Sequence, residues 1–252
     1  MLFPEVEKVI YKINCKESVT CQLRFPSVMK IENEGAVSFK ELVNKNYPEF
    51  SKSIAPTSDE TEQSSTCSGN KIFVFCSKDG KWKINLKNNN LSLSTTNYHD
   101  WEDFKNRLQI PLKALIDSCK IDHFNQIGLR TVYIFMPSKL GLKDVVWKNL
   151  VSPGILGVLA LEDMAGNIEN LENISFIRLA NRNTILKIGT KTVRMTEKGE
   201  IGLTIDEDLS ETADRGLDQI EGSLNHLNAG STRMFRWGIK DRLHKAMKPE
   251  TV

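Results

Sequence analysis

The stretch VFCSKDGKWKINLKNNNLSLSTTNYHDWEDF, from Val74 to Phe104, decides the fold. Apolar and polar residues alternate along three short runs, and the turn sequences KDG and KNNN separate the runs. Gly and Asn tolerate a positive φ, which suits tight turns between antiparallel strands. The stretch therefore predicts a three-stranded antiparallel meander with one apolar face. That face consists of Trp82, Ile84, Leu86, Leu91 and Leu93.

An amphipathic helix is expected directly after the meander, where it can cover the apolar face. Asp100 can cap this helix, and Asp103 follows at the spacing of a capping box. Pro111 lies inside the helix and is expected to kink it, because proline removes one backbone hydrogen bond. One apolar stripe with spacings of 3 and 4 residues is formed by Trp101, Phe104, Leu108, Leu112, Leu115 and Cys119.

The residues before the meander predict a strand, a helix and a loop. Residues 20–25 alternate as a strand does, and Pro26 ends the run. A helix is expected before Pro48, with Val37, Leu42, Val43 and Tyr47 on its apolar side. Residues 51–70 are rich in Ser and Thr and contain no aromatic residue, so we expect a flexible surface loop.

The second half of the chain repeats this order of elements loosely. After a strand over residues 124–136, we expect a short helix within 142–151 and a buried strand over 155–163. Three strands then cover residues 174–180, 184–195 and 200–209, and a helical region runs from Leu217 to Met247 with a break near Gly230. The prediction is an α+β fold of curved antiparallel sheets covered by long helices. Its two similar halves, residues 1–136 and 137–252, would come from an internal duplication.

The overall composition argues against several classes of protein. The chain has 252 residues, of which 40% are hydrophobic, which suffices for one large domain or two small ones. A net charge of +2 disfavours a nucleic-acid coat or a membrane-surface protein. The apolar stretch GILGVLALEDM is far shorter than the ~20 residues that span a bilayer.

The N-terminus and the cysteines indicate the compartment. MLFPEVEKV has neither a basic start nor an apolar h-region, so no secretory signal is expected. The five cysteines have irregular spacings and form no CxxC, which fits reduced thiols. We therefore expect a cytoplasmic protein that does not associate with membranes.

No motif points to a metal, a cofactor or a catalytic nucleophile. The histidines lack metal-ligand spacing, and no Cys or carboxylate cluster joins them. GxSxG, Walker and GxGxxG motifs are also absent from the sequence. The four histidines are His99, His123, His226 and His244.

An acidic run before the last helix admits two interpretations. It could be a metal or general-acid site. It could also be a solvated approach to the helix N-terminus, where the helix dipole favours anions, and this interpretation is favoured. The run consists of Asp206, Glu207, Asp208, Glu211 and Asp214.

Two sets of basic residues are candidates for binding. Arg24 and Arg130 lie inside otherwise apolar strands, where an arginine either pairs structurally or holds an anionic ligand. Arg233, Arg236 and Lys240 would share one face of the last helix and could contact nucleic acid or an acidic partner. An ordinary solvated helix face explains the second set equally simply.

The segments QLRFPSVMKI, NYPEF, KDGKWKINLKNNNLSLSTTNYHDWEDF, FNQIGLR and FRWGIKDRLHKAM occur in this order. Together they resemble a sporadically distributed prokaryotic protein family of about this length, whose function is not established. That family usually continues IGLR with an aromatic residue, whereas here Thr131 stands there and Tyr133 follows. Tyr133 is therefore added to Arg24 and Arg130 as a ligand-site candidate. The resemblance implies an accessory protein, associated with defence or with mobile DNA.

These observations favour a non-catalytic module that binds a small-molecule ligand or a protein partner. The absence of a reactive constellation is the reason. One alternative is an enzyme of unrecognised type, with Arg24, Arg130 and the Asp206 region converging in a cleft between sheet and helix. The other is weak nucleic-acid binding through the C-terminal helix, which the near-neutral charge disfavours.

Overall fold

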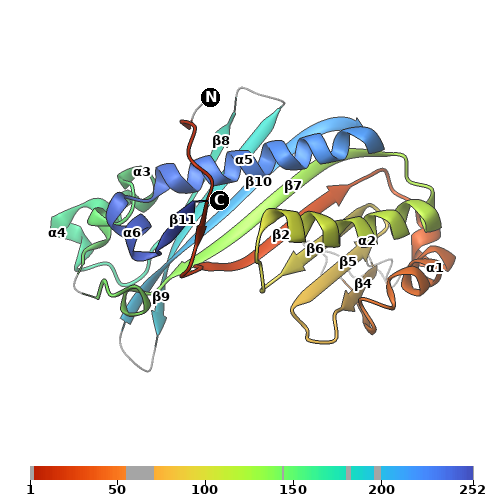
Figure 1. Cartoon of the computed structure of the whole chain (residues 1–252), viewed down its shortest axis with the longest axis horizontal. Helices are drawn as coiled ribbons and strands as arrows, with labels where there is room; N and C mark the ends of the chain where they lie inside the picture. The colour runs from red at the N-terminus through yellow and green to blue at the C-terminus, as the bar shows by residue number, and fades with distance from the viewer. Residues whose placement is uncertain (1–2, 55–70, 144, 180–182, 196–199, 252) are drawn as a thin grey trace, which may run out of the picture. The chain divides into compact units, whose positions relative to one another are not determined.

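The computed structural model describes residues 3–54, 71–143, 145–179, 183–195 and 200–251 (Figure 1). It combines antiparallel strands with α-helices, which confirms the expected α+β class. The chain divides into two compact units. Unit 1 comprises Met1–Val19, Gly128–Thr212 and Glu221–Val252, and unit 2 comprises Thr20–Ile127 and Ala213–Ile220. Both units draw on residues before and after 136, and the expected duplication stays a prediction.

The strands of unit 2 include the meander that the sequence predicts. The strand order is β3-β4-β5-β6-β2. In the register of β5 and β6, Ile84 lies opposite Leu93 and Leu86 opposite Leu91, so the apolar side chains share one face. All four are fully buried. The bounds are β2 Lys16–Arg24, β3 Glu49–Ile54, β4 Lys71–Cys76, β5 Trp82–Lys87 and β6 Asn90–Thr95.

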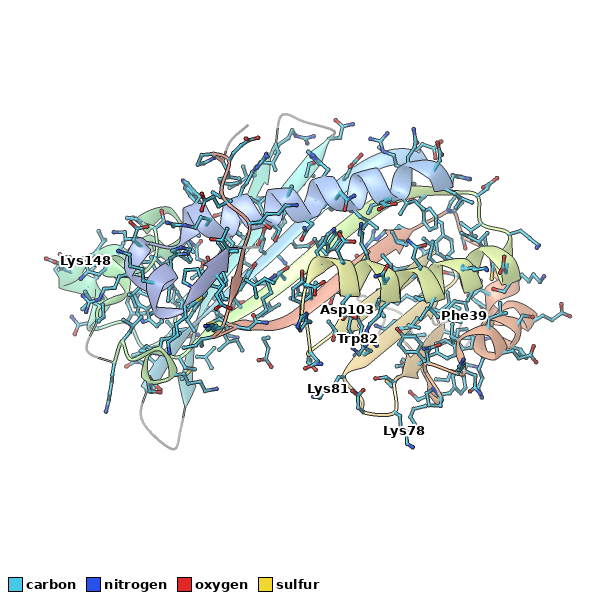
Figure 2. All side chains as sticks on the ribbon, viewed as in Figure 1. Phe39, Lys78, Lys81, Trp82, Asp103 and Lys148 are labelled. Atoms are coloured by element: carbon cyan, nitrogen blue, oxygen red, sulfur yellow. The ribbon has the colours of Figure 1, made fainter. Side chains whose placement is uncertain are left out.

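Helix α2 (Trp101–Cys119) covers this face, as expected. Asp100 caps it, because its carboxylate accepts a hydrogen bond of 2.8 Å from the Asp103 amide. The Phe104 ring lies 5.8 Å from the Trp82 ring, and Phe104 is fully buried. Trp82 and Asp103 lie near each other in Figure 2. The Arg107 guanidinium lies 4.5 Å from the centroid of the Trp82 ring, and its Nε donates a hydrogen bond of 3.2 Å to Asp103 Oδ1. The helix continues through Pro111 without interruption.

Helix α1 (Glu34–Val43), preceded by the 3-10 turn η1 (Met29–Glu32), is confirmed. Of the apolar side predicted for it, Val43 and Tyr47 are buried, but the prediction is wrong for Val37 and Leu42. Val37 and Leu42 are 61% and 50% exposed. Phe39 is buried instead, and its ring packs 5.2 Å from Phe75 of β4. At helical spacing Val43 is compatible with the predicted buried side and with the side that contains Phe39. The burial of Phe39 shows that the second side faces the core.

The loop predicted over residues 51–70 is wrong in its first part. Ser51 to Ile54 belong to β3, where Ser51 lies opposite Val74. Backbone pairing with β4 orders this segment while the side chains of Ser51, Lys52 and Ser53 stay exposed. The rest of the predicted loop lies outside the described residues.

The strands of unit 1 are ordered β2-β7-β10-β9-β8, with β2 contributing its residues up to Val19. Strands β1 and β11 form a separate antiparallel pair. In Figure 1, α5 runs along one face of β10 and β7. The bounds are β1 Val9–Tyr11, β7 His123–Phe135, β8 Glu172–Arg178, β9 Thr184–Met195, β10 Glu200–Gly216 and β11 Pro249–Thr251.

The strand predicted over residues 155–163 is wrong, and so is most of the helix predicted over 142–151. The first region forms α3 (Pro153–Leu156), η4 (Gly157–Ala160) and α4 (Glu162–Ala165). Pro153 is at the first helical position, where its fixed φ favours a helix and its missing N–H costs nothing. In the second region the described residues form only the short turn η3 (Trp147–Asn149), and the turn η2 (Pro137–Leu140) precedes it.

The helical region from Leu217 to Met247 is broken at a different place from the one predicted. It consists of η5 (Leu217–Gln219), α5 (Ile220–Gly238) and α6 (Asp241–Ala246). The break is held by a bridge between Val151 and Ile239. Helix α5 continues through Gly230, where an added Cβ would lie only 3.0 Å from Leu209 Cδ2. Gly230 therefore allows close packing of α5 on β10.

Candidate functional site

The strands of unit 1 differ strongly between their two faces. On the face toward α5, the side chains of Leu186, Ile188, Leu203, Ile205 and Leu209 are buried. On the opposite face, every described side chain of β8, of β9 from residue 185 to 191 and of β10 from 204 to 210 is at least partly exposed. No element that the structure describes in unit 1 buries that second face over these residues.

Strand β8 departs from the usual pattern of a half-exposed strand. Its larger apolar side chains point outward, with Ile174 49% and Phe176 71% exposed. The intervening Asn173 and Ser175 are half-buried. Antiparallel sheets normally place apolar residues inward and polar residues outward. β8 therefore presents an apolar strip where a solvated strand would be polar.

The backbone of β8 is open along its outer edge. β8 is the last strand in the sheet order, with β9 on one side. The Leu179 amide donates to the Thr184 carbonyl, and the Thr192 amide donates to the Leu171 carbonyl. The odd-numbered residues of β8 thus direct their backbone N–H and C=O groups toward β9. In an antiparallel ladder the even-numbered residues between them direct these groups away from β9, toward the open edge of the sheet. These outward residues are Glu172, Ile174, Phe176 and Arg178, and we call them the β8 edge.

Opposite charges flank the apolar part of the β8 edge. Glu172 and Arg178, both exposed, lie at its two ends. Within the sheet, Glu172 lies opposite Lys191, and Arg178 lies opposite Ile185. The β8 edge therefore has a negative end, an apolar centre and a positive end.

Arg130 lies in the same unit and is held by Asp206. Its Nε and Nη2 donate hydrogen bonds of 2.7 and 2.6 Å to the two carboxylate oxygens. This bidentate pairing raises the pKa of Arg130 above its ordinary value. Structural pairing thus occupies the guanidinium, and the ligand role of Arg130 stays a prediction.

The other two ligand-site candidates have different surroundings. Arg24 is exposed at the end of β2 and belongs to unit 2, whereas Arg130 belongs to unit 1. Their predicted convergence in one cleft stays a prediction. Tyr133 of β7 is buried, and its ring stacks at 4.2 Å on Phe235 of α5. Tyr133 therefore contributes to the packing of α5 on the sheet.

The basic residues proposed to contact nucleic acid do not share one helix. Arg233 and Arg236 belong to α5, whereas Lys240 is the N-cap residue of α6. Arg233 pairs with Glu5 at 3.1 Å, and Arg236 pairs with Asp241 at 2.6 Å. Two of the three cations are thus neutralised within the chain, and their role toward a partner stays a prediction.

The acidic run lies in β10, which corrects its interpretation as a solvated approach to the last helix. Strand alternation directs Glu207 and Glu211 toward α5, and both are buried, whereas Asp206 and Asp208 point to the other face. Thr184 lies directly opposite Glu211 on β9. We call the polar side chains enclosed there the buried polar cluster. It consists of Thr184, Glu207, Glu211, Ser223 and Ser231.

Glu207 is the most unusual member of the buried polar cluster. The Ser231 hydroxyl donates to its Oε2 at 3.1 Å, but Oε1 makes no hydrogen bond to any residue that the structure describes. Burial raises the pKa of Glu207 well above its ordinary value, although Ser231 and the Lys16 ammonium act in the opposite direction. Burial also lowers the pKa of Lys16 to about 8. Glu207 is thus a buried carboxyl whose neutral form is favoured by its burial.

The described residues contain no group of His, Cys, Asp and Glu side chains that could hold a metal ion. His99 and His123 pair with the adjacent Asp100 and Asp122. His244 bonds the Tyr11 hydroxyl at 2.8 Å. Among the described helices, none is long and apolar enough to cross a membrane.

Comparison with known proteins leaves the family open. No family model matches the chain, and no curated protein matches it either. The crystal structure of an unknown protein from Galdieria sulphuraria is similar over 89% of this chain and 95% of that chain, with 11% identity and a TM-score of 0.16. Likeness at that level supports no statement about function, so the functional argument rests on this chain's own residues.

Sequence reasoning missed the β8 edge. The alternation of Ile174 and Phe176 is visible in ENISFIR, but it was interpreted as an ordinary strand. The pattern shows that one face is apolar and does not show whether that face is covered. The position of a strand within its sheet is needed for that.

Proposed function

We propose that the protein is a non-catalytic binding module that takes up an extended segment of a protein partner as an added strand on β8. The carrying observation is the exposure of Phe176, at 71%, beside Ile174 on a strand with an open backbone edge. Strand addition uses backbone hydrogen bonds for affinity and alternate side chains for specificity. The β8 edge offers both kinds of contact.

The magnitudes favour a reversible complex. Complete burial of a Phe or Ile side chain contributes roughly 1.5–3 kcal/mol, and both are only partly exposed at the start. Association costs at least about 4 kcal/mol in lost translational and rotational freedom. The two apolar side chains alone therefore do not hold a partner, and the outward backbone groups must contribute. A micromolar affinity is the expected outcome.

A synthetic strand tests this function directly. We expect a capped peptide in which Ile and Thr alternate, of the same seven-residue length as β8, to bind with micromolar affinity by fluorescence anisotropy. Phe176→Ser should weaken binding about tenfold, because the largest exposed apolar contact is lost. Val37→Ser is the matched control, since Val37 is 61% exposed on α1 and should leave binding unchanged.

Proline gives a second, backbone-specific variant. Ile174→Pro removes an outward N–H and leaves the bonds between β8 and β9 intact, because Ile174 is an outward residue. It should abolish peptide binding with little loss of secondary structure by circular dichroism. Equal binding by wild type, Phe176→Ser and Ile174→Pro would refute strand addition at β8.

A second candidate function is catalysis by the buried polar cluster. The observation that favours it is a pair of groups whose pKa values are shifted toward neutrality, Glu207 upward and Lys16 downward. An enzyme would show turnover in a metabolite panel that Glu207→Gln abolishes. Binding of panel members without turnover would support a small-molecule module instead.

Three further expectations belong to the proposal. The protein acts in the cytoplasm, its partner is a protein, and its role is the accessory one that the family resemblance implies. The free thiols of Cys15, Cys21, Cys76 and Cys119 support the first. The apolar β8 edge supports the second, because a nucleic-acid partner would require an unpaired basic surface.

A further inference from the structure

We infer that the partner strand is β8 of a second copy of this chain, paired antiparallel about a two-fold axis at Ser175. This inference rests on the proposed function, because it names the partner that the β8 edge takes up. A two-fold dimer uses the same patch on both subunits, so the patch must be complementary to itself. The β8 edge meets that requirement in its backbone, its apolar residues and its charges.

The backbone allows this register. Rotation about Ser175 places residue 172 opposite 178 and residue 174 opposite 176. All four are outward residues, so each pair can exchange two N–H···O=C bonds across the axis. Ser175 directs its backbone groups to β9 and occupies the non-bonded position on the axis. Sliding one copy by a single residue would set outward groups against inward ones and remove this pattern.

Several registers pair the outward residues of the two copies with each other, and the side chains favour this one among them. Glu172 of one copy lies opposite Arg178 of the other, at both ends of the pair. Ile174 lies opposite Phe176 on the same exposed face, and aromatic residues pair favourably with β-branched ones. Sliding by two residues would set Glu172 opposite Phe176 and remove both charge pairs. The sequence ENISFIR is therefore complementary to itself in one register only.

The contact area indicates a dimer of moderate affinity. One pair of seven-residue strands falls below the roughly 1,200 Å² that marks the low end of specific interfaces. The dimer is therefore expected to dissociate on dilution in the micromolar range. Pairing of the two β8 edges in the dimer also prevents this apolar edge strand from pairing with strands of other proteins.

Charge exchange tests the register. Glu172→Arg alone sets cation against cation at both ends, and Arg178→Glu alone sets anion against anion. We expect each variant to weaken the dimer about tenfold or more in sedimentation equilibrium. An equimolar mixture of the two variants restores opposite charges at both ends, so heterodimers should form with nearly wild-type affinity. The double variant should recover the homodimer.

The control is Lys83→Glu, which makes the same charge change as Arg178→Glu, but at an exposed residue of β5. It should leave the dimer unchanged. A mixture that associates no better than its separate components would overturn the inference, even if the wild type is a dimer. A wild type that stays monomeric at every concentration would also overturn it. Peptide binding at β8 would then show that the proposed function stands with another partner, whereas absence of both would refute function and inference together.

Discussion

Truncation of Phe104 to Ala should lower the free energy of unfolding of unit 2 by about 3–5 kcal/mol. Phe104 is fully buried on α2, and its ring lies within 5.8 to 6.1 Å of the rings of Trp82, Tyr98 and Trp101. The substitution removes the apolar contacts and leaves a cavity between helix and meander that the surrounding rings fill only partly. Urea unfolding followed by tryptophan fluorescence measures the effect, because Trp82 and Trp101 report from the same contact.

The control for Phe104 is Phe176→Ala, which makes the same chemical change at an exposed ring. It should alter the stability of the protein at high dilution by less than about 0.5 kcal/mol, because a surface substitution leaves no cavity. Equal losses in the two variants would contradict the assignment of Phe104 to the core. A loss below about 1 kcal/mol at Phe104 would show that the helix repacks over the meander.

The part of the fold that sequence predicts well is the part set by local pattern. The alternation of the meander and the 3–4 spacing of α2 each specify one element and its buried side. The Asp100 cap is equally local, since its hydrogen bond joins residues three apart. Strand, turn and covering helix follow one another in the chain, so few long-range contacts were needed to predict them.

Predictions failed where an apolar run allows more than one structure. Residues 155–163 are apolar without clear periodicity, and such a run fits a buried strand or short helical turns equally. Pro153 favours the start of a helix, and the residues after it form helical turns and no strand. In α1, Val37 was predicted on the buried side, but Phe39 is buried and packs against Phe75 of β4.

The candidate site depends on topology, which is the reason sequence reasoning missed it. β8 is an edge strand because β9 and β10 follow it in the chain and lie between it and β7 in the sheet. The burial of Glu207 has the same origin, since alternation in β10 directs residue 207 toward α5 and residue 208 away. Five acidic residues close together in the sequence indicate a solvated segment. Only their position in strand β10 shows that two of them are buried.

Replacement of Glu207 by Gln should remove a decline in stability that the wild-type protein shows as pH rises above the ordinary Glu pKa of 4.5. In the unfolded chain Glu207 loses its proton near its ordinary pKa of 4.5, whereas in the folded protein burial raises its pKa well above that value. Between the two pKa values the folded state holds more protons than the unfolded state. The free energy of unfolding therefore falls with rising pH, by up to about 1.4 kcal/mol per pH unit.

Other groups near Glu207 also affect how stability depends on pH, and their effects can be distinguished from that of Glu207. Lys16 has its pKa lowered from 10.5 to about 8, so its contribution rises with pH and is confined to the interval between those values. Asp206 and Asp208 raise the pKa of Glu207 from the opposite face of β10, and the Ser231 hydroxyl lowers it. The difference between wild type and Glu207→Gln isolates the contribution of Glu207, because both proteins contain Lys16, Asp206 and Asp208.

Urea unfolding at a series of pH values measures this difference. Asp214→Asn is the control, because it makes the same acid-to-amide change at an exposed residue of β10 and should keep the wild-type slope. Near pH 5 the Gln variant should be about as stable as the wild type, since both side chains are then neutral in the folded state. At pH 8 it should be the more stable of the two, because only the wild type loses stability over this interval. Parallel curves for wild type and Glu207→Gln would mean that Glu207 is ionised in the folded protein, held by Lys16 and Ser231 despite its burial.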